Sequence, residues 1–167
     1  MVEMGPIYAD LLSAAAGEIR FDCALGSIAR TFSAGGGIVF ELNRKTGVIH
    51  DWVTDRLVIG SDGYDERVNA INPRMRYSLR HAPGHVAHDM LFINEDGMKR
   101  HEFYDWLYRF SGFRYFIGSR LYDEGDVSVF HSIEFAANHG PPSQSEVVAF
   151  ARTARAVANA WRIKTRR

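Results

Sequence analysis

The chain has 167 residues, 46% of them apolar and 13% aromatic, which is enough to bury the core of one domain, or of one domain with an extra helix. Its 20 basic and 20 acidic side chains cancel, so a strongly basic nucleic-acid surface on the body of the domain is not expected. The single cysteine, Cys23, excludes an internal disulfide and suits a reducing compartment. The sequence lacks an apolar run of roughly 20 residues and the basic start of a signal peptide, so we expect a cytoplasmic location.

Residues 1–34 are predicted to form N-terminal helices. Apolar side chains recur at helical spacing from Tyr8 to Ala15 and again from Phe21 to Phe32, with a break at Gly17. The glycines that follow precede a strand instead of opening a helix, so we interpret them as a flexible turn and not as a phosphate-binding loop.

Alternating apolar residues predict several strands after these helices. The strands are expected over residues 38–43, 47–54, 85–90, 127–135 and from Phe113 onward. Short polar turns join the first two and the last two, which therefore form hairpins. The pattern predicts an α+β fold: an antiparallel four- to five-stranded sheet flanked by helices on both sides, in the layout of GAF- and PAS-like domains.

A short helix in the middle of the chain has a clear starting signal. Asn72 can cap it, and Pro73 suits the first helical position because its missing N–H needs no partner there. The arginines on this helix, Arg74, Arg76 and Arg80, are expected to face solvent.

An aromatic helix is predicted over roughly 94–110, ending at Gly112. Five aromatic residues lie between Phe103 and Phe110 and surround most of the helix. A surface helix needs only one apolar stripe, so this helix either packs on two sides or forms the wall of a cavity.

Neither a metal site nor a catalytic site is predicted. His81, His85, His88 and Asp89 carry groups that suit zinc or iron, but on a strand His88 points away from the others. No serine lies in the Gly-x-Ser-x-Gly elbow of a nucleophile, and no two acids are visibly paired. We therefore expect no enzyme, no metal and no other cofactor.

A last helix, within residues 143–167, is predicted to lead to a linker. Ser143 and Glu146 form a capping box at its start. Its apolar stripe is rich in alanine and ends at Trp161, which allows close approach of another helix. The helix is expected both to pack on the N-terminal helices and to contribute to a homodimer.

Several short segments share their order and spacing with one known family. These are Tyr64 through Asn72-Pro73-Arg74-Met75, Pro83-Gly84-His85-Val86 with Asp89, Glu102-Phe103-Tyr104-Asp105-Trp106-Leu107, Gly112-Phe113-Arg114-Tyr115, Gly140-Pro141 and Ser145-Glu146. Over residues 35–160 the chain resembles the N-terminal sensor region of LuxR-type helix-turn-helix regulators. The resemblance implies a GAF/PAS-like, usually dimeric domain that binds a small organic effector, and DNA contact only through a helix-turn-helix domain that is missing here.

The chain departs from the members of that family that bind acyl-homoserine lactones. Those members carry a Trp-x-x-x-Tyr pair upstream of an Asp-Pro, and the aspartate binds the amide of the ligand. In this chain Asn72 precedes Pro73, and the positions of the pair hold Ile59 and Gly63. We therefore expect a different effector, or none.

The sequence thus predicts an effector-sensing and dimerisation domain with residues 35–142 as its GAF/PAS-like core and no membrane contact. A dimerisation module without a pocket and a small enzyme are the alternatives. In the predicted cavity, rings enclose the effector, and the histidines and Tyr115 act as polar anchors. The candidate residues are Trp52, Tyr64, His88, Phe103, Trp106, Tyr115 and His131.

Overall fold

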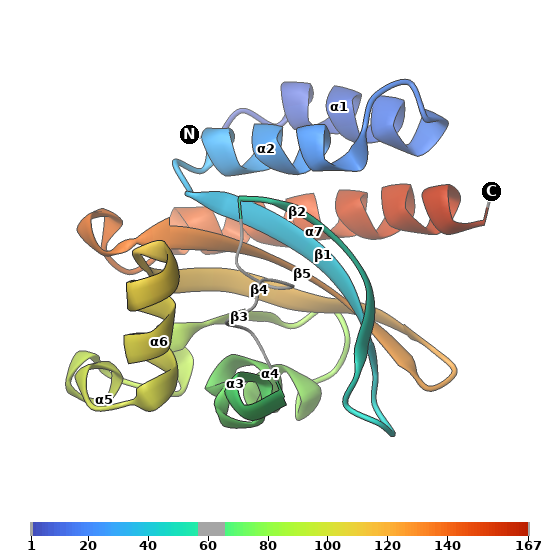
Figure 1. The fold of residues 1–167 in the computed structure, drawn as a ribbon. Helices are drawn as coiled ribbons and strands as arrows, with labels where there is room; N and C mark the ends of the chain where they lie inside the picture. Colours follow the sequence, from blue (N-terminus) through green and yellow to red (C-terminus); the bar gives the residue numbers. More distant parts are fainter. Residues whose placement is uncertain (1, 57–65, 167) are drawn as a thin grey trace.

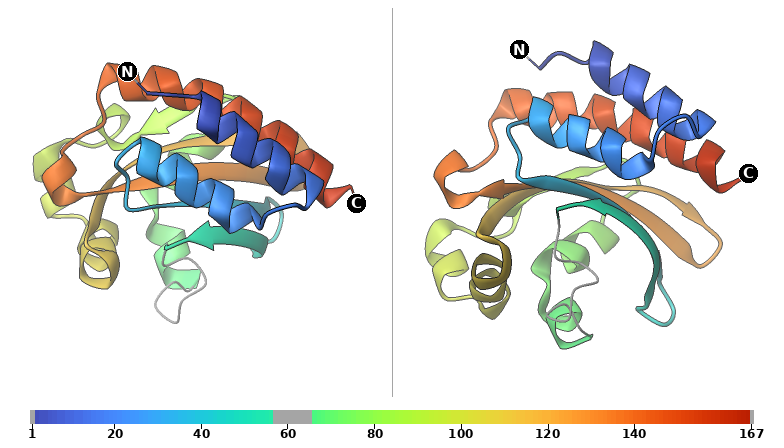
Figure 2. Two further views of the ribbon diagram at one scale, coloured as in Figure 1. Left: turned by 90° about the horizontal axis from the view of Figure 1, so that it is seen from above. Right: turned by 45° about the horizontal axis from the view of Figure 1, so that its top comes forward.

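The computed structural model describes residues 2–56 and 66–166. In this part of the chain a five-stranded sheet lies between two layers of helices (Figure 1). One layer contains α1 (Gly5–Ala16), α2 (Phe21–Thr31) and α7 (Gln144–Thr165). The other layer, on the opposite face of the sheet (Figure 2), contains α3 (Glu66–Ile71), α4 (Pro73–Leu79), α5 (Glu95–Lys99) and α6 (Glu102–Ser111).

The sheet is antiparallel throughout and confirms the predicted α+β class. Its strands are β1 (Gly36–Asn43), β2 (Ile49–Asp55), β3 (Val86–His88), β4 (Phe113–Glu124) and β5 (Val127–Ala136). Their order across the sheet is β2-β1-β5-β4-β3. The two predicted hairpins are therefore present, and the long pairing of β1 with β5 joins them.

Alternation along β5 separates the two sides of the sheet. Ile133 is fully buried in the main core with the terminal helices, as expected for one strand face. Phe130 faces the other way, where it stacks on Phe40 of β1 with ring centroids 5.0 Å apart and forms a smaller cluster with Met75 of α4. Each face of the sheet thus has its own apolar cluster.

The terminal helices close the main core. Ser143 accepts a hydrogen bond from the Glu146 amide at 3.2 Å and its own amide donates to the Glu146 carboxylate at 2.7 Å, so the predicted capping box is present. At the far end of α7, the fully buried Trp161 donates from Nε1 to Glu41 at 3.0 Å and packs edge-on against Phe21. The predicted packing of the last helix on the N-terminal helices is observed.

The middle segment differs from the prediction in two places. The single helix expected over 94–110 is divided into α5 and α6, because the ring nitrogen Nδ1 of His101 accepts a hydrogen bond from the Phe103 amide at 3.1 Å and starts a new helix. The strand expected over 85–90 ends at His88, and a 3₁₀ turn from Asp89 follows it. None of the described helices combines the length and apolar character needed to cross a bilayer.

Candidate functional site

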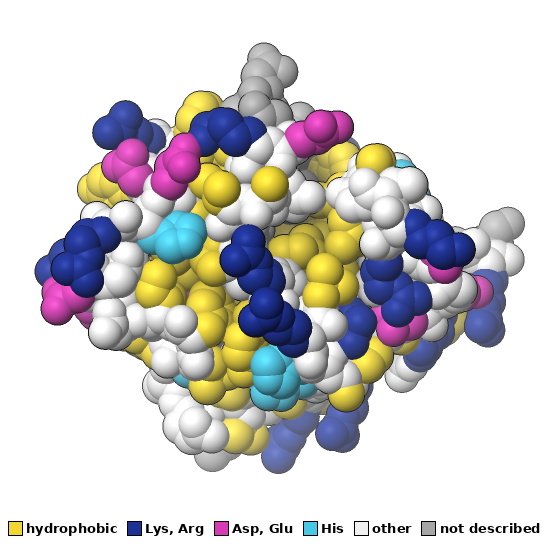
Figure 3. Space-filling view, turned by 90° about the horizontal axis from the view of Figure 1, so that it is seen from below, with side chains coloured by type: hydrophobic (Ala, Val, Ile, Leu, Met, Phe, Trp, Pro, Cys, Tyr) yellow, Lys and Arg dark blue, Asp and Glu magenta, His cyan; other side chains and the backbone are white. Residues whose placement is uncertain are grey.

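A cavity opens between the sheet and helices α4 and α6. The cavity has a volume of about 80 Å³, which is more than a single water molecule needs. Its aromatic lining residues are Phe40, Phe103, Trp106, Phe113, Phe116 and Phe130, and its polar ones include Asn72, Arg74, Ser78, Ser119, Ser132 and Glu134. Figure 3 shows this side of the molecule, where hydrophobic side chains gather between charged groups.

Local signals in the sequence explain how α4 reaches the cavity. The Asn72 side chain accepts hydrogen bonds from the amides of Arg74 and Met75, so the predicted cap forms. With Pro73 in the first turn, the helix starts immediately after the cap and directs Arg74 at the sheet.

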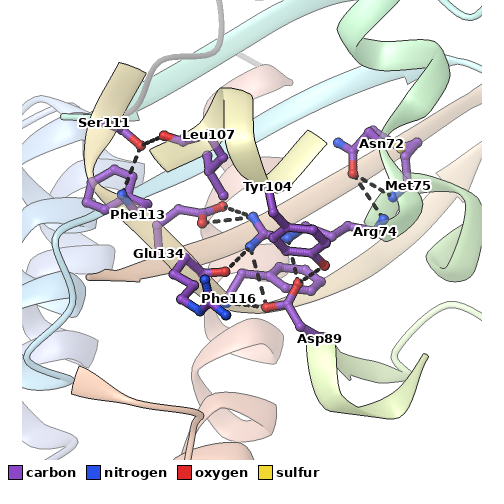
Figure 4. Close-up of polar contacts among 11 residues, drawn as sticks. Asn72, Arg74, Met75, Asp89, Tyr104, Leu107, Ser111, Phe113, Phe116 and Glu134 are labelled. Carbon is purple, nitrogen blue, oxygen red and sulfur yellow. Dashed lines mark hydrogen bonds and ion pairs between the residues drawn. The ribbon is translucent and has the colours of Figure 1, made fainter. Parts of the chain in front are cut away.

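Arg74 is the central polar residue of this region and is only 6% exposed. Its Nε donates to Asp89 Oδ1 at 2.9 Å, and its Nη1 donates to both carboxylate oxygens of Glu134, at 2.9 and 2.8 Å. Figure 4 shows the guanidinium between the two carboxylates. The ion network therefore links α4 to β5 and to the turn after β3.

Further contacts complete the network around Asp89, which is fully buried. The hydroxyl of Tyr104 donates to Asp89 Oδ1, and the amide of Phe116 donates to Oδ2 at 2.8 Å. The Phe116 ring also lies under the guanidinium of Arg74, 4.4 Å from its carbon to the ring centroid. Asp89 is thereby held by α4, α6 and β4 together.

Burial and charge shift the protonation of these groups. Burial disfavours the charged guanidinium, but Asp89 and Glu134 outweigh it and raise the pKa of Arg74 above its ordinary value. Burial raises the pKa of Tyr104, so its hydroxyl stays protonated and donates. Burial, together with the negative charge of Asp89, raises the pKa of Glu134 to about 7 despite the nearby guanidinium.

The sequence had placed Arg74 in solvent, and that expectation is wrong. An arginine on a short helix usually faces water, and the acids that bury this one lie 15 and 60 residues away in the chain. Asp89 and Glu134 were not among the candidate site residues. The apolar residues Ile133 and Phe135 on either side of Glu134 were the one local signal that could have singled it out.

Two of the candidate residues lie together in the cavity wall. Phe103 and Trp106 both come from α6, and their ring centroids are 6.0 Å apart. Tyr108 and Phe110 of the same helix are more than half exposed, so the aromatic residues of α6 are divided between the cavity side and the surface.

His131 contributes its strand position but not its ring to the cavity. Its imidazole is fully buried on the opposite face of the sheet, where it stacks on Phe150 of α7 at a centroid distance of 5.1 Å. Nδ1 donates to the carbonyl of Ile38 at 2.9 Å, and burial lowers the pKa of His131 to about 4. The ring is therefore a neutral core group and not the polar anchor that the sequence suggested.

Trp52, Tyr115 and His88 are not among the described residues that line the cavity. Trp52 faces the same side as Phe40, its partner across the β1–β2 pair, but it is 42% exposed on the edge strand. Tyr115 is buried and donates its hydroxyl to Glu95, and His88 lies on the short edge strand β3. Tyr64 lies outside the described residues.

Two of the three histidines considered for a metal site have other partners. His81 and His85 stack on each other at 4.4 Å, and the hydroxyl of Tyr77 lies 3.1 Å from His85 Nε2. Asp89 is committed to Arg74. Within residues 2–56 and 66–166 no group of three or more His, Cys, Asp or Glu side chains is arranged to hold a metal ion.

Comparison with known proteins identifies solved structures with a similar fold. No protein-family model matches the sequence, and the search of curated protein sequences gave no match. Among solved structures, CepR2 from Burkholderia cenocepacia, described as an N-acylhomoserine lactone dependent LuxR family transcription factor, is 14% identical, with 94% of this chain and 92% of that chain covered and a TM-score of 0.65. The VqsR LBD domain from Pseudomonas aeruginosa is 10% identical, with coverages of 96% and 95% and a TM-score of 0.68.

A GAF domain is also similar. GAF3 of Slr1393 from Synechocystis sp. PCC6803 is 14% identical, with 90% of this chain and 92% of that chain covered and a TM-score of 0.50. At sequence identities this low, the similarity shows the fold alone. The chain therefore has the GAF-like α+β fold that the LuxR-family regulator CepR2 also adopts.

Proposed function

We propose that this protein is the effector-sensing domain of a LuxR-type transcriptional regulator and binds a small organic molecule between the sheet and helices α4 and α6. The observation that carries the proposal is the cavity itself, which has aromatic walls and a buried ion network at one side. The fold shared with CepR2 supports the same function, because that protein is described as a LuxR family transcription factor.

The effector proposed here is not an acyl-homoserine lactone. Asn72 stands before Pro73, and its side-chain oxygen is used to cap α4. The next residue, Arg74, extends into the cavity region and is held by Asp89 and Glu134. This wall thus offers a different set of polar groups from the one that the lactone-binding members use. We assign effector binding to the core formed by residues 35–142.

Ligand-dependent melting tests the proposed function. A library of small organic molecules is screened for compounds that raise Tm, because a ligand that binds only the folded state stabilises it by RT ln(1 + [L]/Kd). Ser132→Leu places a larger side chain in the cavity and is expected to abolish the shift caused by any hit. Ser145→Leu, on the exposed first turn of α7, is the matched control and keeps it.

Two results would contradict the proposal. One is a library without any stabilising compound. The other is a set of hits that stabilise Ser132→Leu as strongly as the wild type, because such compounds bind elsewhere on the protein.

We further propose that the terminal helices form a homodimer. A surface groove runs between α1 and α7, and its lining is largely apolar: Tyr8, Leu11, Leu12, Ala15, Ala156, Asn159, Ala160 and Ile163. Leu12 is 69% exposed and Ile163 is nearly half exposed. A second copy of the same helices would cover this surface, as in an isologous interface.

A further inference from the structure

The geometry points to an organic ammonium ion as the effector, with its N–H groups donating to Glu134 and its apolar part among the aromatic rings of the cavity. This inference rests on the proposed function, because it names the class of ligand for the same cavity. Three observations carry it: the guanidinium of Arg74 that is already paired, the excess negative charge of the ion network, and the aromatic lining of the cavity.

Each nitrogen of Arg74 already donates to a protein acceptor. Nε donates to Asp89, Nη1 donates to Glu134, and Nη2 is directed at Asp89 and at the Arg114 carbonyl, 3.4 and 3.1 Å away. An anionic ligand in the cavity would therefore meet the carboxylate of Glu134 beside a guanidinium that is already paired.

The network carries one more negative than positive charge when both acids are ionised. Arg74 supplies one positive charge, and Asp89 and Glu134 supply two negative ones. Asp89 accepts hydrogen bonds from Arg74, Tyr104 and the Phe116 amide and does not line the cavity. Glu134 lines it, so the uncompensated charge is presented to a ligand by this residue.

The aromatic rings that line the same cavity suit the rest of an ammonium ion. Phe40 and Phe130 stack on one wall, and Trp106 of α6 lies on the cavity lining with them. Aromatic faces attract organic cations, most strongly where water is excluded. Ser132, two residues before Glu134 on the same strand face, adds a hydroxyl oxygen that can accept a further N–H.

Three probes of one skeleton test the inference: benzylamine, benzyl alcohol and benzoate, each titrated at millimolar concentrations into the wild-type protein at pH 8 and observed by ligand NMR. We expect benzylamine to bind at least about tenfold more tightly than benzoate, since its ammonium can donate charge-assisted hydrogen bonds to Glu134, whereas the carboxylate of benzoate is repelled by it. Benzyl alcohol, a neutral donor, is expected to lie between them.

The pH dependence in the wild type provides a test that needs no variant. The charged groups around Glu134 are Arg74 and Asp89, with the Tyr104 hydroxyl beyond them, and Glu134 itself titrates near neutrality. Benzylamine stays protonated at pH 8 and at pH 6, whereas Glu134 is mostly ionised only at the higher pH. The affinity of the protein for benzylamine is therefore expected to fall by up to about tenfold between pH 8 and pH 6.

A pair of variants tests whether Glu134 is the residue that recognises the ammonium group. Glu134→Gln keeps an oxygen that can accept from Arg74 but removes the charge, and it should lose most of the preference for benzylamine over benzyl alcohol. Glu124→Gln, exposed at the end of β4, is the matched control and should keep the preference.

The outcomes separate this inference from the proposed function. Benzoate or benzyl alcohol binding as tightly as benzylamine overturns the ammonium preference and leaves a ligand-binding cavity intact. The same holds for benzylamine binding that changes neither with pH nor with Glu134→Gln. If none of the three probes binds while library compounds of another class bind in a Ser132-dependent way, the inference fails and the sensing function stands.

Discussion

Nη1 of Arg74 donates to both carboxylate oxygens of Glu134, a residue 60 positions further along the chain, at 2.9 and 2.8 Å. The pair connects a helix of one layer directly to a central strand of the sheet. Since Arg74 also binds Asp89, a single side chain forms ion pairs with two buried acids. Position 74 is therefore a site where one substitution should have a large effect on stability.

Arg74→Met should lower the free energy of unfolding by about 3–5 kcal/mol, because it leaves two carboxylates buried without their cation. Urea denaturation at pH 8 measures the change. Arg76→Met, on the same helix but exposed, is the control and should change stability by no more than about 0.5 kcal/mol. Equal effects of the two substitutions would show that the buried network adds nothing to stability.

Phe150→Ala should cost about 3–5 kcal/mol. The ring is fully buried in the main core, where it contacts both His131 and Phe32, and its removal leaves a cavity between α7 and the sheet. Val148→Ala on the exposed side of α7 is the matched control. Chemical denaturation of both variants checks the prediction, and a loss below about 1 kcal/mol for Phe150→Ala would contradict the packing described here.

Acid should destabilise the protein through His131. The pKa of this buried histidine is lowered to about 4, so between about pH 6.5 and pH 4 the unfolded chain binds a proton that the folded chain does not. Stability therefore falls as the pH falls through this window, by up to about 3 kcal/mol. Stability changes in this direction because the pKa of a basic group is lower in the folded chain than in the unfolded chain.

Glu134 acts in the opposite direction over nearly the same range, since its raised pKa makes the folded state bind the extra proton. The two effects are separated by comparing wild type with His131→Gln at each pH. The variant should retain more of its stability at pH 5 than the wild type does, relative to pH 8. His50→Gln, partly exposed on β2, serves as the control and should follow the wild-type curve. Parallel curves for wild type and His131→Gln would refute the prediction.

The proposed dimer predicts a change in oligomeric state. Leu12→Glu puts a charge in the groove between α1 and α7 and should convert dimer to monomer in sedimentation velocity. Tyr108→Glu, at a residue of α6 that is also more than half exposed, should leave the dimer unchanged. A wild-type protein that sediments as a monomer at high micromolar concentration would contradict the dimer.

Much of the fold could be predicted from local sequence patterns. The alternation along β5 correctly grouped His131 with Ile133, and the capping signals at Asn72 and Ser143 marked true helix starts. These features depend on residues close together in sequence, so a single sequence displays them. The break at His101 was missed because histidine is an uncommon cap, and its ring nitrogen takes the role that a serine or asparagine oxygen usually has.

The site was harder to predict because its parts are brought together only by the fold. Phe103 and Trp106 were placed in the cavity wall because α6 is visibly aromatic. The periodicity that grouped the side chains of β5 could not say which of the two helical layers encloses the cavity, and His131 was assigned to the wrong side for that reason. Arg74 has no local signal at all, since its partners come from two distant elements.

The central pairing of β1 with β5 has a consequence for synthesis on the ribosome. The amino-terminal hairpin stays an incomplete sheet edge until residues up to Ala136 have emerged, and α1 can pack on α7 only after Thr165 has emerged. Such sequence-distant contacts form slowly and leave an unpaired edge in the meantime. A nascent chain of this protein should therefore depend on chaperone protection until α7 is released.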